Sequence, residues 1–159
     1  MMKKLIHCLK HFIRCLMNRY PLVTCHFQVE WGGTRLDFSE VSGLNIEHDV
    51  IEYREGSSKE YTPVKMPGLA KYSNIVLKRG IMPGDNEFFQ WVRTINLNQV
   101  ERRDITIKLL NEEHNPVVVW KIKNAWPVKY EGPELKADAS EAAIETLELA
   151  HEGLTIESE

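Results

Sequence analysis

The sequence has few cysteines, no long apolar run and no motif of a familiar catalytic site. Its three cysteines are odd in number and all fall within the first 25 residues. A disulfide framework would need cysteines spread along the chain, so this usage favours synthesis in a reducing cytoplasm. No segment approaches the roughly 20 consecutive apolar residues of a membrane helix, and insertion of this chain into a membrane is not expected.

The patterns that mark common chemistry are absent as well. The chain has no glycine-rich phosphate loop, no Cys-x-x-Cys pair and no serine or cysteine in a nucleophile elbow. Two glutamates precede His114 and could imitate an acid–base cluster, but charged residues are expected in a solvated turn. The other histidines of the body are scattered, as surface or hydrogen-bonded histidines are. We therefore predict no catalytic, cofactor-binding or metal-binding residues.

What is present suits one globular domain: 159 residues, 43% hydrophobic and 27% charged. The net charge of -3 hides an asymmetry. Residues 1–19 carry five basic side chains and no acidic one, so the remaining residues hold 15 of the 20 basic and all 23 acidic groups, a net -8. An acidic body repels phosphates, which disfavours nucleic-acid binding as the main function even though the four tryptophans have some lysine neighbours.

The first sixteen residues, MMKKLIHCLKHFIRCL, differ from everything that follows. They could be a signal peptide, but charged residues and histidines interrupt the apolar run that one needs. They could be a basic amphipathic helix on a membrane surface. The third interpretation, which we favour, is that translation starts at Met17. The histidines and cysteines in this segment match no established zinc spacing. We expect residues 1–16 to be a non-native, disordered or helical extension and residues 17–159 to be the domain.

From Pro21 onward the signals are mainly those of strands and turns. Residues 23–31 and 34–38 flank a Gly-Gly pair, which suits a tight hairpin turn with positive φ. Short strands are expected over residues 41–47 and 48–53, and the polar stretch 54–67 is expected to form a long projecting hairpin or loop. A further strand is expected over residues 72–79.

One helix is predicted, over residues 86–97. Phe88, Trp91, Val92 and Ile95 have the i, i+3, i+4, i+7 spacing of a single apolar face. A turn precedes them, and either the aspartate or the asparagine at positions 85 and 86 can cap the free N–H groups of the first turn.

The last third of the chain contains one further hairpin and one conflict. Residues 104–110 and 117–128 are rich in β-branched and aromatic residues and read as paired strands. Residues 140–154 have the propensity, the cap and the apolar spacing of a helix. Residues 146–151 also alternate as a half-solvated strand does, and the local sequence leaves the choice open.

The order of these stretches resembles a known family, the inner-tube proteins of contractile tails, found in phages and in phage-derived extracellular contractile injection systems. The resemblance covers residues 19–156 and leaves out residues 1–16. The stretches that carry it are FQVEWGG (27–33), FSEVSGL (38–44), VIEYREGSS (50–58), MPGLAKYSNIVLKRG (66–80), GDNEFFQW (84–91), RRDITIKLLNEEHNPVVVWKIKNAWP (102–127) and AIETLELAHEGLTI (143–156).

The resemblance implies a mainly β fold, an antiparallel β-barrel or sandwich with one flanking α-helix, and a strand over residues 143–156. It also implies a structural subunit, not an enzyme, without a cofactor: six copies form a ring, and rings stack into a hollow tube. The implied partners are other copies of the chain, a contractile sheath protein, baseplate or hub proteins, tube-terminating proteins, and a DNA or protein payload in the lumen. The chain would be made in the cytoplasm and then assembled into a phage tail or an extracellular injection particle.

The projecting segment 48–67 is the expected contact between subunits, because a polar projection can reach a neighbour without being adhesive when alone. The acidic body, if its charges face the lumen, would let cargo pass without adhering. Two related functions remain open: a specialised ring that joins the tube to the baseplate, and a secreted ring-forming effector carrier of the type VI kind. The candidate residues for ring stacking or subunit contact are Glu52, Tyr53, Arg54, Glu55, Glu60, Tyr61 and Lys65.

Overall fold

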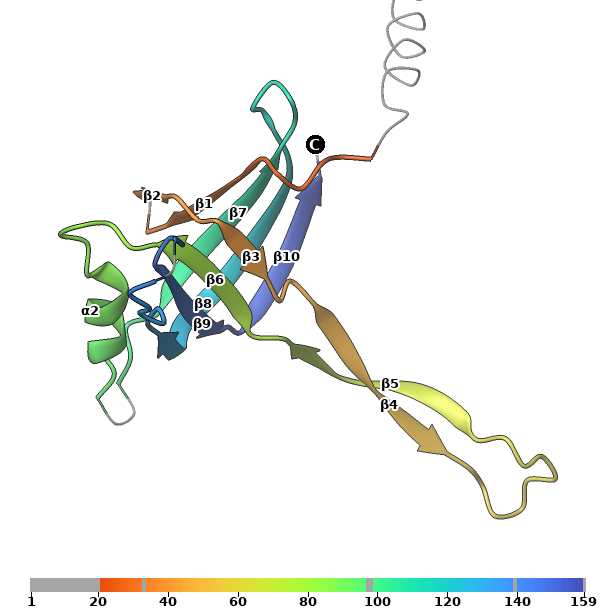
Figure 1. The fold of residues 1–159 in the computed structure, drawn as a ribbon. Coiled ribbons are helices and arrows are strands. Elements are labelled where there is room, and N and C mark those ends of the chain that lie inside the picture. Colours follow the sequence, from red (N-terminus) through yellow and green to blue (C-terminus); the bar gives the residue numbers. More distant parts are fainter. Residues whose placement is uncertain (1–20, 33, 97–98, 139, 159) are drawn as a thin grey trace, which may run out of the picture.

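The computed structural model describes residues 21–32, 34–96, 99–138 and 140–158, so the predicted extension over residues 1–16 lies outside the described residues. Within them the fold is mainly antiparallel β with one α-helix, as predicted (Figure 1). The elements are β1 (Phe27–Trp31), β2 (Thr34–Leu36), β3 (Glu40–Ser42), β4 (Ile46–Tyr53), β5 (Val64–Tyr72), β6 (Ile75–Gly80), α2 (Glu87–Arg93), β7 (Arg103–Leu110), β8 (Pro116–Glu131), β9 (Ile144–Ala150) and β10 (Gly153–Ser158).

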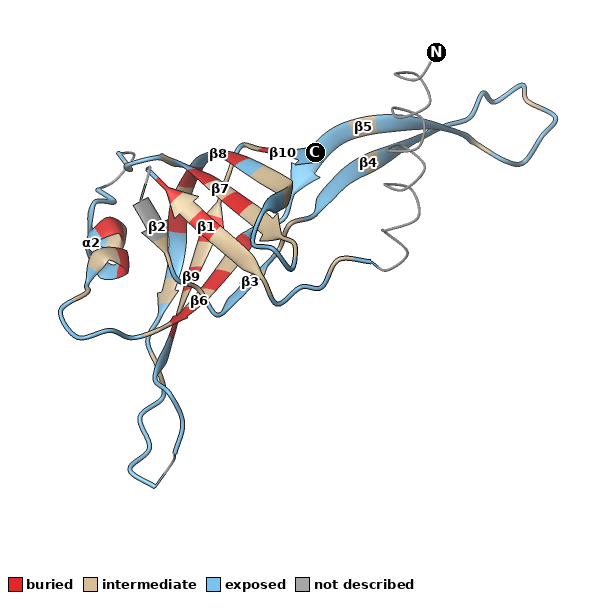
Figure 2. Ribbon diagram, turned by 90° about the horizontal axis from the view of Figure 1, so that it is seen from above, coloured by how far each residue is buried: buried red, intermediate tan, exposed pale blue. Residues whose placement is uncertain are grey.

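Eight strands form one curved sheet in the order β2-β1-β7-β8-β9-β6-β3, with β10 also paired to β8 (Figures 1 and 2). The long strand β8 pairs with β7 on one side and with both β10 and β9 on the other. Strands β9 and β10 therefore follow one line beside β8, interrupted at residues 151–152. In the described part of the chain the end strands β2 and β3 do not pair with each other, so the barrel is open on that side.

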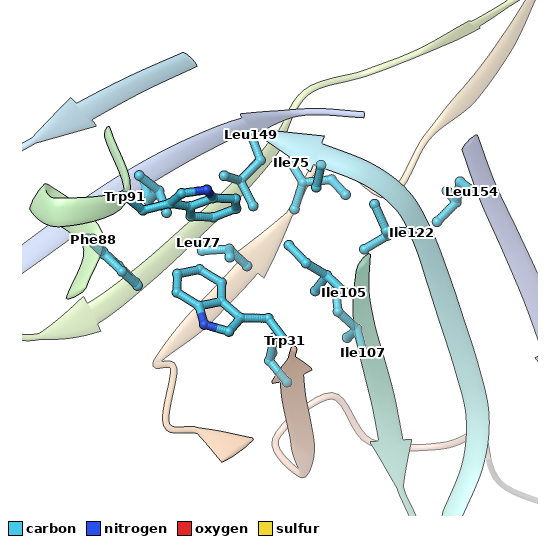
Figure 3. Packing of buried hydrophobic residues seen from close by; sticks show 13 residues of the cluster. Trp31, Ile75, Leu77, Phe88, Trp91, Ile105, Ile107, Ile122, Leu149 and Leu154 are labelled. Carbon is cyan, nitrogen blue, oxygen red and sulfur yellow. The ribbon is translucent and has the colours of Figure 1, made fainter. Parts of the chain in front are cut away.

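The core lies inside the curve of the sheet (Figure 3). Strand side chains alternate between two faces, and in β6 this alternation buries Ile75 and Leu77 while in β9 it buries Leu147 and Leu149. Two tryptophans, one on β1 and one on α2, add the largest buried surfaces. The buried apolar cluster consists of Val29, Trp31, Ile75, Leu77, Phe88, Trp91, Ile105, Ile107, Ile122, Ala125, Leu147, Leu149 and Leu154.

Helix α2 packs against the core with the predicted apolar face. Phe88 and Trp91 are fully buried, and the Trp91 ring meets Trp31 edge-on at 4.7 Å. Of the two predicted caps, the one formed is Asp85, whose carboxylate accepts the Glu87 backbone N–H at 3.0 Å. The helix is shorter than predicted and ends at Arg93.

The early end of α2 has a local cause at Thr94. The Thr94 N–H and side-chain hydroxyl both donate to the Trp91 carbonyl, which tightens and ends the last turn. Ile95, predicted to lie on the helix face, therefore lies beyond the helix and is 37% exposed.

The helical interpretation of the C-terminal stretch is wrong: the chain is extended as the resemblance implied, but as two strands, β9 and β10, rather than one strand over residues 143–156. Residues 144–150 are strand β9, paired with β6 on one side and β8 on the other. Pairing on both edges, with Leu147 and Leu149 buried, outweighs a propensity difference of about 1 kcal/mol. The helical cap predicted at the start of this stretch is not formed, because residues 140–143 are irregular chain and a strand follows them.

The ends of several other elements differ by a few residues from those predicted. The predicted turn at the two glycines is present: Gly32 has φ +57°, and Trp31 pairs with Thr34 across it, while Gly33 lies outside the described residues. The predicted loop 54–67 is shorter than expected, because β5 begins at Val64. Strand β8 reaches Glu131 and so extends beyond the predicted strand over residues 117–128.

Candidate subunit-contact surface

The β4–β5 hairpin extends far out from the barrel as a separate two-stranded sheet (Figures 1 and 2). Strands β4 and β5 pair with each other, and the register joins Ile46 to Tyr72 at the barrel end and Tyr53 to Val64 near the tip. An isolated two-stranded hairpin is only marginally stable in water. A projection of this kind is typical of a segment that completes its packing on another molecule.

The hairpin leaves the barrel through a close backbone crossing, which we call the hairpin root (residues 43–45 and 73–74). Gly43 has φ +88°, and a Cβ atom there would lie 2.0 Å from the Asn74 carbonyl oxygen. The Asn45 carbonyl accepts the Ser73 N–H at 3.3 Å. Only glycine fits both the conformation and the contact, so the sequence at position 43 determines how the hairpin leaves the barrel.

The outer half of the hairpin has two different faces. Ile51 pairs with Met66, and Tyr53 pairs with Val64, so these four side chains lie on one face, which we call the distal apolar face. The intervening pair, Glu52 and Lys65, lies on the opposite face with its charged atoms 3.6 Å apart. All four apolar residues are exposed, from 42% for Met66 to 64% for Val64.

The tip of the hairpin is held by Arg54. Its guanidinium donates to the Glu60 carbonyl at 2.8 Å and to the Ser58 carbonyl at 3.1 Å. The same group lies over the Tyr61 ring, 5.6 Å from its centroid. Tyr61 is 93% exposed, so the tip presents an aromatic ring to solvent in a fixed place.

Exposed apolar side chains are concentrated on this hairpin. Nine of the eighteen large hydrophobic residues that the structure describes as exposed lie between positions 46 and 72, although that segment is a small part of the chain. Exposed apolar surface that is contiguous marks an interaction site more often than scattered residues do. The nine are Ile46, Val50, Ile51, Tyr53, Tyr61, Val64, Met66, Leu69 and Tyr72.

All seven candidate contact residues fall on the outer half of this hairpin, but their roles differ. Tyr53 belongs to the distal apolar face, Tyr61 is presented at the tip, and Arg54 holds the tip together. The expectation of a merely polar projection missed Ile51, Val64 and Met66. The alternation of residues 51–53, Ile-Glu-Tyr, already contained this signal, because it places an apolar residue on each side of Glu52.

The inner half of the hairpin, between the distal apolar face and the barrel, carries a charged pair. The Lys71 ammonium lies 2.7 Å from the Asp49 carboxylate, and that hydrogen bond raises the pKa of Lys71 above its usual value. Both side chains are exposed, where such a pair adds little stability. This charged pair lies nearer the barrel than the distal apolar face, although Ile46, Leu69 and Tyr72 are also exposed in the inner half of the hairpin.

Outside the hairpin, a buried network of hydrogen-bonded polar side chains connects α2 to the sheet. The Arg79 Nε donates to Glu145 at 2.6 Å, the guanidinium donates twice to Asp85, and the Tyr130 hydroxyl donates to Glu145 at 3.0 Å. Both Arg79 and Glu145 are only 6% exposed. The Glu87 N–H and then the Arg79 guanidinium lower the pKa of Asp85, and burial followed by the bond to Glu145 raises the pKa of Tyr130. Every member has a partner within the fold, so the network holds the helix in place.

The histidine considered as a possible acid–base residue lies in a turn of the fold. His114 lies in the turn between β7 and β8, with φ +60° and its ring against His26 at 5.0 Å. Among the described residues no group of three or more His, Cys, Asp or Glu side chains is arranged to hold a metal ion, and no helix is long and apolar enough to cross a membrane. An open cavity of about 370 Å³ near β3 is lined mainly by apolar side chains, Phe27, Val41, Leu44, Ile107, Leu109 and Trp120.

Comparison with solved structures relates this fold to contractile injection systems. A chain in the cryo-EM structure of the PVC sheath–tube complex of an extracellular contractile injection system, in the extended state, is 34% identical, with a TM-score of 0.83 over 91% of this chain and 97% of that chain. A chain in the anti-feeding prophage cap is 37% identical, with a TM-score of 0.83 over 89% and 93%. A chain in the six-fold symmetrised anti-feeding prophage baseplate is 26% identical, with a TM-score of 0.78 over 87% and 97%.

Comparison with curated proteins finds no match. The family model described as "T4-like virus tail tube protein gp19", however, matches residues 23–155, which include all the described strands but the last residues of β10. The chain therefore belongs to the T4-like virus tail tube protein gp19 family and is a structural tube subunit rather than an enzyme.

Proposed function

We propose that six copies of this chain form a ring and that these rings stack into the inner tube of a contractile tail or injection particle. The observation that carries the proposal is the distal apolar face, which is exposed on a projection too thin to bury it. Similar chains occur in a sheath–tube complex, a tube-terminating cap and a baseplate, which supports a place in such an assembly. A contractile sheath protein would surround the tube, and terminating and baseplate or hub proteins would bind its ends.

The hairpin is the proposed contact between stacked rings. Burying an exposed aliphatic or aromatic side chain contributes about 1.5–3 kcal/mol, so the four residues of the distal apolar face could supply most of one contact. Around them, Glu52, Glu55, Glu60 and Lys65 would pair with charges of the neighbour and set the register. Arg54 keeps the tip in the conformation that presents Tyr61.

The open edge of β10 supports contact within a ring. Strand β10 pairs with β8 on one side, and in the described residues its other edge carries no strand, because β5 turns away from the barrel at the hairpin root. Unpaired edges attract further strands, and head-to-tail contacts between identical subunits close into rings. Ile156, 57% exposed on this strand, would be covered by such a contact.

The payload is proposed to be DNA or protein in the lumen. The outward face of the barrel sheet carries cross-strand pairs, in which Lys108 bonds Glu30, Lys121 bonds Glu157 and Lys78 bonds Glu40. A face with paired charges of both signs binds neither an anionic nor a cationic cargo tightly, and such a face would suit a channel lining.

Electron microscopy of the purified full-length chain in negative stain tests the proposal. Rings with six-fold symmetry, or tubes built from them, are expected, whereas a chain that stays monomeric at every concentration would contradict it. Copy number in purified particles separates the related functions. A main tube protein is present in many copies, a ring that joins tube to baseplate in few, and a secreted carrier of the type VI kind would be found outside such particles.

A further inference from the structure

The hairpin root is contacted by a histidine whose two ring nitrogens both face backbone carbonyl oxygens. His151 lies between β9 and β10, and its Nδ1 is 3.2 Å from the carbonyl oxygen of Gly153. Its Nε2 is 3.1 Å from the carbonyl oxygen of Ser73, which joins β5 to β6. The ring also packs against Tyr72 at 5.3 Å. One side chain therefore connects the barrel to the end of the hairpin.

The number of bonds that His151 can make here depends on its protonation. A carbonyl oxygen only accepts hydrogen bonds. A neutral imidazole has a single N–H, so it donates to one of the two carbonyls and directs a lone pair at the other. The imidazolium has two N–H groups and donates to both. The arrangement is complete only in the charged form.

We propose that His151 is a pH-dependent contact that fixes the direction of the β4–β5 hairpin. The imidazolium joins Ser73 to Gly153 and holds the hairpin root closed. Loss of the proton removes one of the two bonds and loosens the root. The contact is therefore complete when the ring is protonated and loses one of its two bonds when the ring is neutral.

The charged neighbours of the ring have partners of their own. Glu148 on β9 accepts the Asn74 amide at 2.7 Å, and Glu152 is bonded by Arg102 and by Asn124. Both carboxylates bond these partners rather than the imidazole, so the carbonyl pair is what distinguishes the two protonation states of the ring. The ionisable side chains at the barrel ends of β4 and β5 are Glu47, His48, Asp49, Lys71 and Tyr72, and Lys123 on β8 lies opposite Gly153.

The consequence for assembly rests on the proposed function of the hairpin. A hairpin that leaves the barrel in a fixed direction has already lost the freedom that ring stacking would otherwise remove. Tubes should therefore form more readily at pH 5.5 than at pH 8, and this difference should be smaller when residue 151 cannot be protonated.

Amide hydrogen exchange and ring nitrogen-15 NMR on the full-length chain test the contact directly. The Ser73 amide is the reporter, because its bond to Asn45 closes the root. After correction for the intrinsic pH dependence of exchange, its protection factor should rise about fivefold between pH 8 and pH 5.5. A change of this size corresponds to the free energy that one ordinary hydrogen bond contributes. The rise should follow the titration that the His151 ring itself shows by NMR.

Two variants complete the test. His151→Gln keeps a side chain that can donate hydrogen bonds but cannot become a cation, so the rise in Ser73 protection should disappear. His114→Gln removes a histidine far from the root and should leave the rise unchanged. An equal rise in His151→Gln, or flat protection across the wild-type titration of His151, would overturn the proposal. If His151→Gln does not fold, the wild-type titration alone decides. None of these readouts needs tubes, so a flat result leaves the tube proposal standing, and a chain that forms no rings leaves this contact standing.

Discussion

Ile51 on β4 lies directly opposite Met66 on β5, and both side chains are exposed on the same face of the hairpin. Two facing apolar residues on a two-stranded projection have no core of their own to enter. Together with Tyr53 and Val64 they form a surface whose burial requires a second molecule. Because the chain belongs to the tail tube protein family, we infer that this second molecule is another copy of the chain.

The first prediction concerns this face. Ile51→Asp places a charge where we expect an apolar contact, so stacking should weaken at least tenfold, since about 1.5 kcal/mol or more of burial is lost and a charge is desolvated. Sedimentation of tubes measures the change. Leu135→Asp, the same kind of substitution at an 85% exposed residue outside the hairpin, is the control. Equal sedimentation of both variants and the wild type would count against the assignment.

The second prediction concerns the charges around the tip. Neutralising Glu52, Glu55 and Glu60 together to glutamine should weaken stacking while leaving single rings intact, because these carboxylates are proposed to contact the next ring. The effect should be smaller than that of Ile51→Asp and should shrink as salt is added, since exposed pairs contribute about 0–1 kcal/mol and are screened. Rings that polymerise normally at low salt would show that these residues are not contacts.

The third prediction concerns the hairpin root. Gly43→Ala and Gly84→Ala both place a side chain at positive φ, which costs about 1–2 kcal/mol. The Cβ atom at position 43 would also lie 2.0 Å from the Asn74 carbonyl, whereas nothing lies within 4 Å of the one at position 84. Gly43→Ala should therefore lower the free energy of unfolding clearly more than Gly84→Ala in thermal or denaturant unfolding. Equal losses would mean that the backbone crossing at the root is not tight.

The fourth prediction is a pH dependence at Asp85. The Glu87 N–H and the Arg79 guanidinium lower the pKa of this carboxyl in the folded chain. A carboxyl of this kind adds stability that is complete above its unfolded pKa of about 3.9 and is lost as the pH falls through the folded pKa. The difference in unfolding free energy between wild type and Asp85→Asn should therefore be largest near pH 7 and shrink below about pH 4.

The control for this variant is Asp138→Asn, a change at an exposed aspartate outside the network. It should leave the dependence of unfolding on pH close to that of the wild type. A wild-type difference from Asp85→Asn that stays constant between pH 7 and pH 3 would contradict the assigned direction of the Asp85 shift.

Much of the fold could be predicted because its elements have local signals. Phe88 and Trp91 have helical spacing and are buried on α2, and the Gly-Gly pair marks the turn after β1. The C-terminal stretch could not be decided locally. Its alanines, glutamates and leucines favour a helix, and only pairing with β6 and β8, far away in the sequence, makes it a strand.

The projection that carries the candidate contact residues was predicted, but its apolar side chains were not recognised. Residues 48–67 were expected to project, and they lie on the projecting β4–β5 hairpin. The polar residues around Gly56 hid the fact that Ile51 and Met66 share one face, since that depends on the register of β4 against β5 and on the irregularity between His48 and Val50. The contact of His151 with Ser73 was beyond prediction, because nothing local indicates that residues 78 positions apart meet.

Oxidative footprinting of the distal apolar face tests the central claim most directly. Hydroxyl radicals modify exposed Met and Tyr side chains, and mass spectrometry locates the modification in unassembled chain and in assembled tubes. Met66 and Tyr53 should react readily in the unassembled chain and become strongly protected in tubes, while Met82, 65% exposed beyond β6, serves as the reference. Met66 and Tyr53 that react equally before and after assembly would contradict the account of the hairpin as the contact between subunits.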